Sequence, residues 1–339
     1  MTAPTPQENL KRGAHDEANT LSPDQRTLTV ALIIPVFNEA DTIAAFLSDT
    51  RAVIDPLQTS RLRFQLLFVN DGSTDGTLDA LCGARRDDSR IRIVDLSRNF
   101  GKEAALTAGL DACDADAAIP IDVDLQDPPG LIPQMIDRWR EGAEVVVAKR
   151  ADRSSDSRAK SHSASLFYRV HNMLSKTQIP ENVGDFRLMD RAVLDVLKNL
   201  PERRRFMKGL FAWVGFKTAI IEYKRAPRSG GVTRFTPWKL WNLALEGIAS
   251  FSSVPLEIWG YVGSVISVLA FLYGGVLIGR TMIFGADVPG YTSLMTGMLF
   301  LGGIQLIGIG VLGQYLGRVY DEVKRRPIYV VRKIYEDDD

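Results

Sequence analysis

The sequence predicts an α/β domain with a mostly parallel sheet, followed toward its C-terminal end by a hairpin of two transmembrane helices. Two observations predict this architecture. From residue 28 to about residue 223, short apolar runs alternate with helix-length amphipathic segments, which is the pattern of βαβ units. Beyond them, residues 258–279 and 288–317 contain no charged residue. Because about 20 apolar residues of helix cross a bilayer core of about 30 Å, each stretch is long enough to span it.

The predicted strands are the apolar runs, and the predicted helices lie between and after them. Strands are expected at 28–34, 65–70, 91–96, 117–121, 144–148 and 217–223. Helices are expected at 41–54, 75–85, 102–112, 130–140, 164–176 and 190–200. Strands that alternate with helices in this way imply parallel pairing over most of the sheet.

The domain organisation follows from shifts in composition. Residues 1–27 are polar and lack the apolar segment of a signal peptide, so we expect a disordered tail. The α/β domain is expected over 28–235. Residues 236–254 carry an apolar stripe with two tryptophans and predict an amphipathic helix in the headgroup layer, the alternative being a core helix of the globular domain. Two spans follow over 255–317, and 318–339 form a tail.

Basic residues flank the predicted spans on both sides. Lys and Arg are frequent before the first span and after the second, while the short loop between the spans carries Arg280 and Asp287. By the positive-inside rule, the α/β domain and the tail both lie on the cytoplasmic side of the membrane. The expected protein is therefore multi-pass, with a cytoplasmic domain.

The overall composition excludes several classes of protein. The chain has 41 Lys+Arg and 41 Asp+Glu, so it lacks the basic excess of a nucleic-acid binder. Its two cysteines, Cys82 and Cys113, exclude a disulfide framework and a cysteine-rich metal site. Its three histidines do not stand at HExxH spacing, which leaves little room for zinc chemistry.

Acidic residues gather just after three of the predicted strands. Glu39 follows the first, Asp71 the second, and Asp122 and Asp124 the fourth. In an open parallel sheet, ligands bind in the crevice beyond the carboxyl ends of the strands, so we expect these acids to meet in one cleft. A single such acid could equally be a helix cap, and Asp75 especially suits that role.

Asp122 and Asp124 form the most informative pair. If the strand continues through them, positions i and i+2 share one face, and two carboxylates there repel each other unless a cation lies between them. Oxygen ligands without His or Cys select a hard cation, Mg²⁺ or Mn²⁺, to which Gln126 could add a neutral oxygen. The chain has neither a GxxxxGK[ST] loop nor a GxGxxG turn after a strand. A metal with a nucleotide diphosphate remains, and Asp71 is placed to accept from the base or the ribose.

The chain resembles the family 2 glycosyltransferases, which have the GT-A (Rossmann-like) fold, through the segments IPVFNEAD, VNDGSTDGT and DVDLQDPP. It is most similar to their polyprenyl-phosphate branch, the dolichol-phosphate mannose synthase and bactoprenol glucosyltransferase group. SRNFGKEAALTAGLDAC, VGDFRLMDR and the two C-terminal spans carry that similarity. The resemblance covers roughly residues 28–335.

The resemblance implies roles for individual residues. The nucleotide of a UDP- or GDP-sugar would be held by Pro35, Phe37, Glu39 and Asp71, with Lys102 nearby unless it is a solvated helix start. The divalent metal, Mg²⁺ or Mn²⁺, would be held by Asp122, Asp124 and Gln126. The phosphate of the lipid acceptor would be held by Arg150 and Ser165, assisted by Arg158 or Lys160, whose basic loop is otherwise a solvated surface.

Asp185 would be the catalytic base by the same resemblance. The acceptor, however, is a phosphate monoester with a second pKa of about 6, so it is largely ionised at neutral pH and needs little deprotonation. Asp185 would then orient the acceptor phosphate, or act electrostatically together with Arg187. A structural Asp–Arg pair that braces the loop is the third alternative.

The expected reaction is the inverting transfer of a sugar from a UDP-sugar to undecaprenyl (polyprenyl) phosphate at the cytoplasmic face of a bacterial inner membrane, for cell-envelope glycan modification. Glucose is the expected sugar, with GlcNAc, galactose, aminoarabinose and mannose as alternatives. A processive polysaccharide synthase is disfavoured because its Gln-x-x-Arg-Trp motif is missing. A catalytically silent, membrane-tethered nucleotide-sugar binder is the rival from another class.

The glycine-rich second span bears on assembly. Gly302, Gly303, Gly308, Gly310 and Gly313 would allow close helix approach, either in a homo-oligomer, which we expect, or within the hairpin itself.

Overall fold

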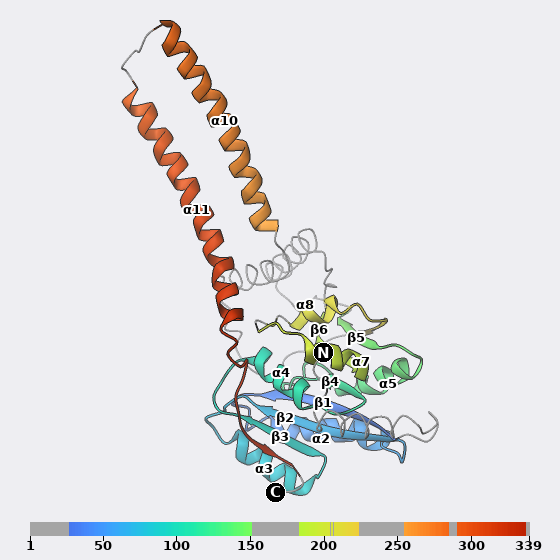
Figure 1. The fold of residues 1–339 in the computed structure, drawn as a ribbon. Helices are drawn as coiled ribbons and strands as arrows, with labels where there is room; N and C mark the ends of the chain where they lie inside the picture. The colour runs from blue at the N-terminus through green and yellow to red at the C-terminus, as the bar shows by residue number, and fades with distance from the viewer. Residues whose placement is uncertain are drawn as a thin grey trace, which may run out of the picture.

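The computed structural model describes residues 27–150, 183–203, 205, 207–223, 254–284 and 290–336. Within these ranges it contains an α/β domain from which two long helices project (Figure 1). Several predictions lie outside the described residues. They are the N-terminal tail up to residue 26, the helix at 164–176, and the interfacial helix at 236–254 apart from Val254, which begins the first long helix.

The described part of the α/β domain is built on an eight-stranded mixed sheet with the order β7-β5-β6-β4-β1-β2-β3-β8. The strands are β1 (Leu28–Val36), β2 (Leu62–Asn70), β3 (Ile91–Leu96), β4 (Ala117–Pro120), β5 (Val145–Arg150), β6 (Val183–Asp190), β7 (Thr218–Tyr223) and β8 (Val331–Tyr335). The neighbours β4-β1-β2-β3 are parallel, as are β5 and β7. β6 is antiparallel to both of its neighbours, and β8 is antiparallel to β3.

All six predicted strands are present, and the predicted fold is confirmed. The sequence reading missed β6 and β8. β6 mixes buried apolar residues with Gly184, Asp185 and Arg187, so it shows neither an apolar run nor a clean alternation. β8 is short and largely exposed, and it forms only because it is added to the edge of β3 after the long helices. It comes from the segment that the sequence suggested was a tail.

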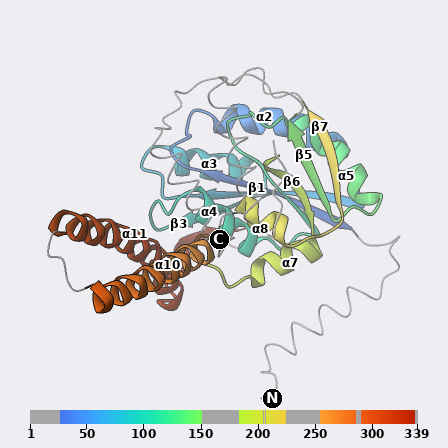
Figure 2. The same ribbon diagram turned by 90° about the horizontal axis from the view of Figure 1, so that it is seen from above.

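Helices cover both faces of the sheet (Figures 1 and 2). On one face lie α2 (Ile43–Ile54), α3 (Thr77–Asp87) and α5 (Ile132–Arg140). On the other lie α4 (Lys102–Ala112), α7 (Arg191–Asn199) and α8 (Met207–Trp213). Each face buries its own apolar cluster, so the described α/β domain has three layers.

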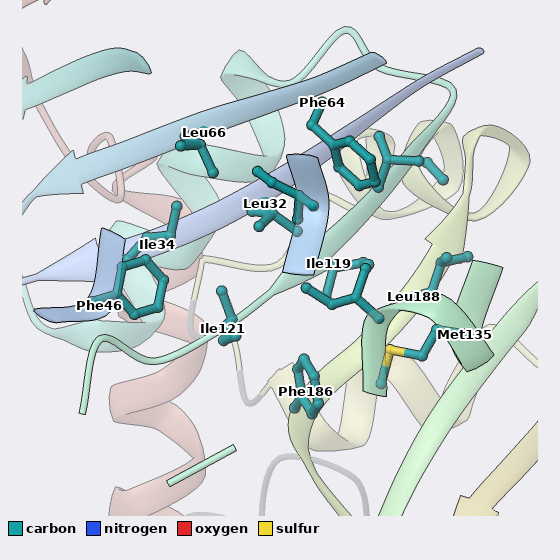
Figure 3. Packing of buried hydrophobic residues seen from close by; sticks show 14 of the residues in the cluster. Leu32, Ile34, Phe46, Phe64, Leu66, Ile119, Ile121, Met135, Phe186 and Leu188 are labelled. Carbon is teal, nitrogen blue, oxygen red and sulfur yellow. The ribbon is translucent and has the colours of Figure 1, made fainter. Parts of the chain in front are cut away.

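The cluster beneath α2, α3 and α5 joins the central strands to the antiparallel strand β6. Figure 3 shows Leu32 of β1 lying close to Ile119 of β4 and Ile34 lying nearer Phe46 of α2, with Phe186 and Leu188 of β6 completing the layer. In the same cluster, Phe46 of α2 meets Phe68 of β2 edge to face, with ring centroids 6.1 Å apart. This packing holds the central strands and β6 in place relative to the helices on this face.

Gly109 sets the position of α4 on the opposite face. A Cβ at this glycine would lie 2.3 Å from Ile33 Cγ2, so α4 approaches β1 more closely than any other residue would permit. The close packing holds the first turn of α4, which carries Lys102, at the carboxyl ends of the parallel strands.

The two long helices are α10 (Val254–Phe284) and α11 (Tyr291–Val323), which run side by side away from the sheet (Figures 1 and 2). Within the described residues one segment, Phe300–Val323, is long and apolar enough to cross a membrane, and 6% of its most apolar window is buried. The first predicted span stays a prediction. α11 also continues six residues past the predicted end of the second span at 317.

The sequence left open whether the glycines of α11 serve contacts within the helix pair or between copies of the chain, and Gly308 serves a contact within the pair. A Cβ at Gly308 would lie 1.8 Å from Trp259 Nε1, so this glycine allows α11 to approach α10. At Gly302, Gly303, Gly310 and Gly313 an added Cβ would meet nothing within 4 Å in the described structure. One glycine therefore serves the contact within the helix pair, and the other four leave the helix surface open.

Candidate active site

A pocket of about 300 Å³ opens at the carboxyl ends of the central strands. The loops that follow β1, β2, β3 and β4 build it, as the topology of a parallel sheet requires. Its lining residues are Pro35, Val36, Phe37, Glu39, Asp71, Asn99, Gly101, Lys102, Ala105, Asp122, Val123 and Asp124. Every residue suggested for the nucleotide, and both suggested metal-binding carboxylates, therefore line one pocket.

Asp71 joins two of these loops. It is 3% exposed, and its two carboxylate oxygens accept hydrogen bonds from the backbone amides of Phe100 (2.7 Å) and Gly101 (2.9 Å). Burial raises the pKa of Asp71, although the two amides and the charge of Arg98 act in the opposite direction. Since a carboxylate has about four acceptor positions, the two amides leave capacity for a ligand group.

Gly72 explains the tight turn after Asp71. Its φ is +64°, and a Cβ there would lie 2.2 Å from the carbonyl carbon of Arg98. The loop after β2 and the loop after β3 therefore touch backbone to backbone at this point, and only glycine fits.

The loop after β1 is fastened to the loop after β2 through Asn38, whose φ is +55°. The Asn38 amide donates to Ser73 Oγ (3.0 Å), and Asn38 Oδ1 accepts from the Thr74 amide (2.9 Å). Asp75 accepts from the Thr77 amide at 3.0 Å, but it is not the N-cap that its helix-cap interpretation proposed, because the N-cap of α3 is Gly76, which makes no side-chain cap hydrogen bond. Phe37 stays 43% exposed at the pocket, where an aromatic face suits stacking on a base.

The strand-alternation argument for Asp122 and Asp124 was wrong in its geometry. β4 ends at Pro120, so the two acids lie in the turn that follows, where Leu125 has a φ of +55°. The turn nevertheless brings both acids to the same pocket. Asp124 Oδ1 also accepts from the Gln126 amide at 3.1 Å.

Lys102 bridges two carboxylates. Its Nζ lies 2.7 Å from Asp122 Oδ2 and 3.2 Å from Asp185 Oδ2. Although the side chain keeps 48% of its surface exposed, the surrounding protein removes water from it and would lower its pKa. The two carboxylates outweigh this effect, and the pKa of Lys102 is raised, so the ammonium stays charged.

The two carboxylates respond differently to the same ammonium. Burial raises the pKa of Asp122 despite Lys102, and the charges of Asp185 and Asp124 add to the rise. For Asp185, burial again favours a higher pKa and is the largest single cause, but the charges of Lys102, Lys208 and Arg187 together with the hydrogen bond from Lys102 outweigh it, and the net pKa lies below its usual range. Asp185 is thus held as a carboxylate.

The pocket lining carries more negative than positive charge. Among the described lining residues, Glu39, Asp71, Asp122 and Asp124 supply four carboxylates against the single ammonium of Lys102. An anionic diphosphate would be repelled by such a lining unless a cation came with it.

The donor atoms fit a hard divalent cation. No group of three His, Cys, Asp or Glu side chains suited to a metal occurs among the described residues. Mg²⁺, however, is usually bound through one or two carboxylates together with substrate phosphates and water, which Asp122 and Asp124 could provide. Gln126 lies outside the pocket lining. It is buried, and its Nε2 has no hydrogen-bond partner within the described structure.

Asp185 and Arg187 do not brace each other as the structural alternative suggested. Asp185 forms its ion pair with Lys102, whereas the Arg187 guanidinium donates to the Gly184 carbonyl (2.7 Å) and stacks on Phe211 at 4.1 Å. Arg187 is 4% exposed, and burial lowers its pKa to about 10, with Asp185 acting against the shift. Neither residue lines the pocket, but Lys102 connects Asp185 to it.

Three buried polar atoms on or beside β6 lack partners within the described part of the chain. They are Asp185 Oδ1, Arg187 Nε and Arg150 Nε. Arg150 ends β5 beside Tyr223, and its guanidinium lies 3.9 Å from the position that a Cβ of Gly184 would occupy. Buried polar atoms without partners are rare, which makes this end of β5 and β6 a candidate ligand site. Arg158, Lys160 and Ser165 lie outside the described residues.

Glu103 was missed by the sequence reading. Its carboxylate accepts from the Met207 amide at 3.2 Å, which ties the first turn of α4 to the start of α8. Loss of surrounding water raises the pKa of Glu103 to about 7, and the charge of Asp185 adds to the rise, even though the side chain keeps contact with solvent. The feature of the sequence that could have indicated Glu103 is its position directly after Lys102. Asn99, Gly101 and Ala105 were also missed as pocket residues.

Comparison with known proteins identifies the family. The model for "Glycosyl transferase family 2" matches residues 31–197. The chain is 50% identical over 306 residues to a prophage-derived bactoprenol glucosyl transferase of Shigella flexneri, covering 90% of this chain and 98% of that protein. It is 51% identical over 307 residues to a prophage bactoprenol glucosyl transferase homolog of Escherichia coli K12, covering 91% and 99%.

A solved structure is also similar to the chain. It is a glucosyl-3-phosphoglycerate synthase of Mycobacterium tuberculosis in complex with Mn²⁺, UDP-glucose and phosphoglyceric acid, with 19% identity, a TM-score of 0.43, and coverage of 70% of this chain and 81% of that one. The near-complete coverage of relatives about half identical in sequence decides the assignment: the chain is a glycosyltransferase that belongs to glycosyl transferase family 2, in the branch that contains the bactoprenol glucosyl transferases.

Proposed function

We propose that the protein transfers glucose from UDP-glucose to a polyprenyl phosphate, with inversion at the anomeric carbon, at the cytoplasmic face of a bacterial inner membrane. The observation that carries the proposal is the acidic pocket with the Asp122–Asp124 turn, found in a chain about 50% identical to bactoprenol glucosyl transferases over nearly their whole length. The relatives support the sugar and the acceptor. The pocket supports a metal-bound nucleotide as the donor.

The donor half of the site uses the loops after β1, β2 and β3. Phe37 offers a face for the base, and Asp71 keeps acceptor capacity for the nucleoside while it holds the loop after β3. Asp122 and Asp124, with Gln126 behind them, would hold Mg²⁺ or Mn²⁺ against the diphosphate. That ion, when bound, supplies positive charge to the diphosphate that departs. Lys102 adds a second positive charge beside Asp122.

The acceptor half uses the end of β5 and the start of the antiparallel strand β6. The lipid phosphate is an ionised nucleophile at neutral pH, with a second pKa of about 6, so the protein has to position it more than deprotonate it. Arg150 offers a half-buried guanidinium, whose Nε is buried without a partner in the described structure, for that purpose, and Arg158, Lys160 and Ser165 are proposed to assist. Asp185, held ionised by Lys102, orients the acceptor instead of removing a proton. Attack by the phosphate oxygen on C1 as the nucleotide leaves gives inversion.

The long helices place this chemistry at the lipid surface. The apolar side chains of α10 and α11 that the structure describes are largely exposed, an arrangement that water penalises and a bilayer permits. We propose that both helices span the membrane, with the α/β domain on the cytoplasmic side. The open glycines of α11 support a homo-oligomer in the membrane.

A donor screen tests the proposal. Purified full-length protein in detergent would be incubated with undecaprenyl phosphate, Mg²⁺ or Mn²⁺, and each of UDP-glucose, UDP-GlcNAc, UDP-galactose, UDP-aminoarabinose and GDP-mannose. We expect lipid-linked glucose from UDP-glucose alone, loss of transfer with EDTA, and an inverted anomer by NMR. Transfer of a different sugar would overturn the choice of glucose. Nucleotide binding without any transfer would instead favour the silent binder.

A further inference from the structure

The segment that follows α11 returns to the sheet and enters β8 at the end of β3 that lies toward the donor pocket. β8 pairs antiparallel with β3, and Leu96, the last residue of β3, faces Val331. The next amide, that of Ser97, donates to the Val330 carbonyl at 2.8 Å. The residue before Val330 is Tyr329, whose hydroxyl donates to Asp111 of α4 at 2.8 Å. The C-terminal segment therefore holds both the end of β3 and the helix that carries Lys102.

Arg332 is the extra residue of a bulge in this pairing. Asp95 faces Lys333 while the next residue of β3, Leu96, faces Val331, so β8 advances two residues where β3 advances one. Bulges of this kind occur beside active sites, where they redirect a side chain. Here the guanidinium of Arg332 donates to the Ser97 carbonyl (2.7 Å) and lies 3.4 Å from Asp95 Oδ2.

Asp95 connects Arg332 to Asn70, the last residue of the neighbouring strand β2. It is 1% exposed, and its other oxygen accepts from Asn70 Nδ2 at 2.7 Å, while Asn70 Oδ1 accepts from the Ser73 amide at 3.3 Å. Arg332 thus supplies the cation for a carboxylate buried beneath the loop after β2. Without it, the side-chain partner left to the buried Asp95 carboxylate among the described residues is the Asn70 amide group.

Arg332 reaches the start of one pocket loop directly through Ser97, and that of the other indirectly, through Asp95 and its partner Asn70. Ser97 starts the loop that lines the pocket with Asn99 and Gly101 and donates two amides to Asp71. Asn70 precedes Asp71 and Gly72, whose backbone lies against the same loop. A shift at Ser97 or Asn70 therefore reaches Asp71 within one to four residues.

We propose that Arg332 is a positioning residue of the donor pocket, and that the C-terminal strand β8 completes that pocket after the chain has passed through α11. The membrane-anchoring helix and the nucleotide site are then joined through one short segment. Arg332 lies outside the pocket lining and acts through Asp95 and Ser97. The use of a nucleotide as probe rests on the proposed function.

The test compares Arg332→Ala with Glu336→Gln in the full-length protein. Glu336 is a matched control because it pairs with Arg92 on the same β8–β3 seam, but at the end of β3 that lies away from the pocket. Hydrogen–deuterium exchange would follow the peptide that contains the Phe100 and Gly101 amides. Titration with UDP and Mn²⁺, together with the KM values for UDP-glucose and undecaprenyl phosphate, would follow function.

For Arg332→Ala we expect faster exchange of these two amides and a roughly tenfold higher KM for the donor, the size expected for loss of hydrogen bonds to a charged group. We expect kcat and the acceptor KM to change by less than about twofold. Arg332→Lys, which keeps one charged donor, should restore part of the donor KM, and Glu336→Gln should match the wild type. If Arg332→Ala does not fold, the Lys variant carries the comparison.

Unchanged exchange of the Phe100–Gly101 peptide in Arg332→Ala, or equal effects of Arg332→Ala and Glu336→Gln, would overturn the positioning role. The exchange measurement needs no substrate, so it decides the role of Arg332 even if the protein fails to transfer glucose. Transfer of glucose together with unchanged exchange would overturn only this inference.

Discussion

The ammonium of Lys102 lies 2.7 Å from Asp122, and this contact joins the first turn of α4 to the turn after β4. The same nitrogen lies 3.2 Å from Asp185 of β6. One cation therefore connects the acid that is proposed to hold the metal with the acid that is proposed to orient the acceptor. The donor and acceptor halves of the site are therefore linked electrostatically through Lys102, which neither the Asp122 segment nor the Asp185 segment of the sequence reveals alone.

Lys102→Met removes that link while keeping most of the volume of the side chain. Because the charge of Lys102 holds the pKa of Asp185 below its usual range against the effect of burial, the variant should have a higher Asp185 pKa. When the pH is lowered, Asp185 then becomes protonated at a higher pH than in the wild type. Protonation of the acceptor phosphate lowers kcat/KM near its second pKa of about 6 in both proteins, and we expect the further loss that comes from protonation of Asp185 to begin at a higher pH in the variant. A pH profile of kcat/KM in which that further loss begins at the wild-type pH, together with reduced activity, would show that Asp185 does not control it.

Asp124→Ala tests the proposed metal-binding pair. Asp124 lines the pocket and is an acceptor for the Gln126 amide, and no other described contact requires its carboxylate. We expect transfer to fall by at least about 100-fold, because stabilisation of the leaving diphosphate by a metal is worth several kcal/mol. Circular dichroism and membrane fractionation should match the wild type. Near-normal turnover would remove Asp124 from the metal site.

The sequence predicted the parallel core and the pocket because local patterns determine both. A continuous apolar run such as the one in β1 is typical of a strand that is buried on both faces of a parallel sheet. The acids that follow such strands therefore lie at the same edge of the sheet, where the pocket is. For this reason Glu39, Asp71, Asp122 and Asp124 could be grouped without any coordinates.

What the sequence did not predict depends on contacts between distant segments. β6 is fixed by its two antiparallel neighbours, and β8 by addition to β3, so neither has a pattern of its own. The role of Arg332 depends on a bulge in that pairing, and the Lys102–Asp185 contact depends on where β6 is inserted. Strand alternation also failed at Asp122, because β4 ends at Pro120.

Asp185→Asn separates a base from an orienting group. An acceptor phosphate with a second pKa of about 6 arrives ionised at pH 7.5, so the variant should lose no more than about tenfold in kcat/KM, roughly 1.4 kcal/mol. A base role predicts a much larger loss. The measurement is the rate of transfer to undecaprenyl phosphate between pH 5.5 and 8, with Asp195→Asn on the exposed face of α7 as a control.

Gly72→Ala tests whether the contact between the two donor loops is required. The φ of +64° alone costs a non-glycine residue about 1–2 kcal/mol, and the added Cβ would lie 2.2 Å from the Arg98 carbonyl carbon, which is backbone and cannot turn aside. The loop after β3 must therefore move away from Asp71, and its two amides lose their acceptor. We expect a donor KM at least about tenfold higher and a lower Tm. Gly83→Ala, where a Cβ meets nothing within 4 Å, should leave both unchanged, and a wild-type donor KM in Gly72→Ala would show that the loops tolerate separation.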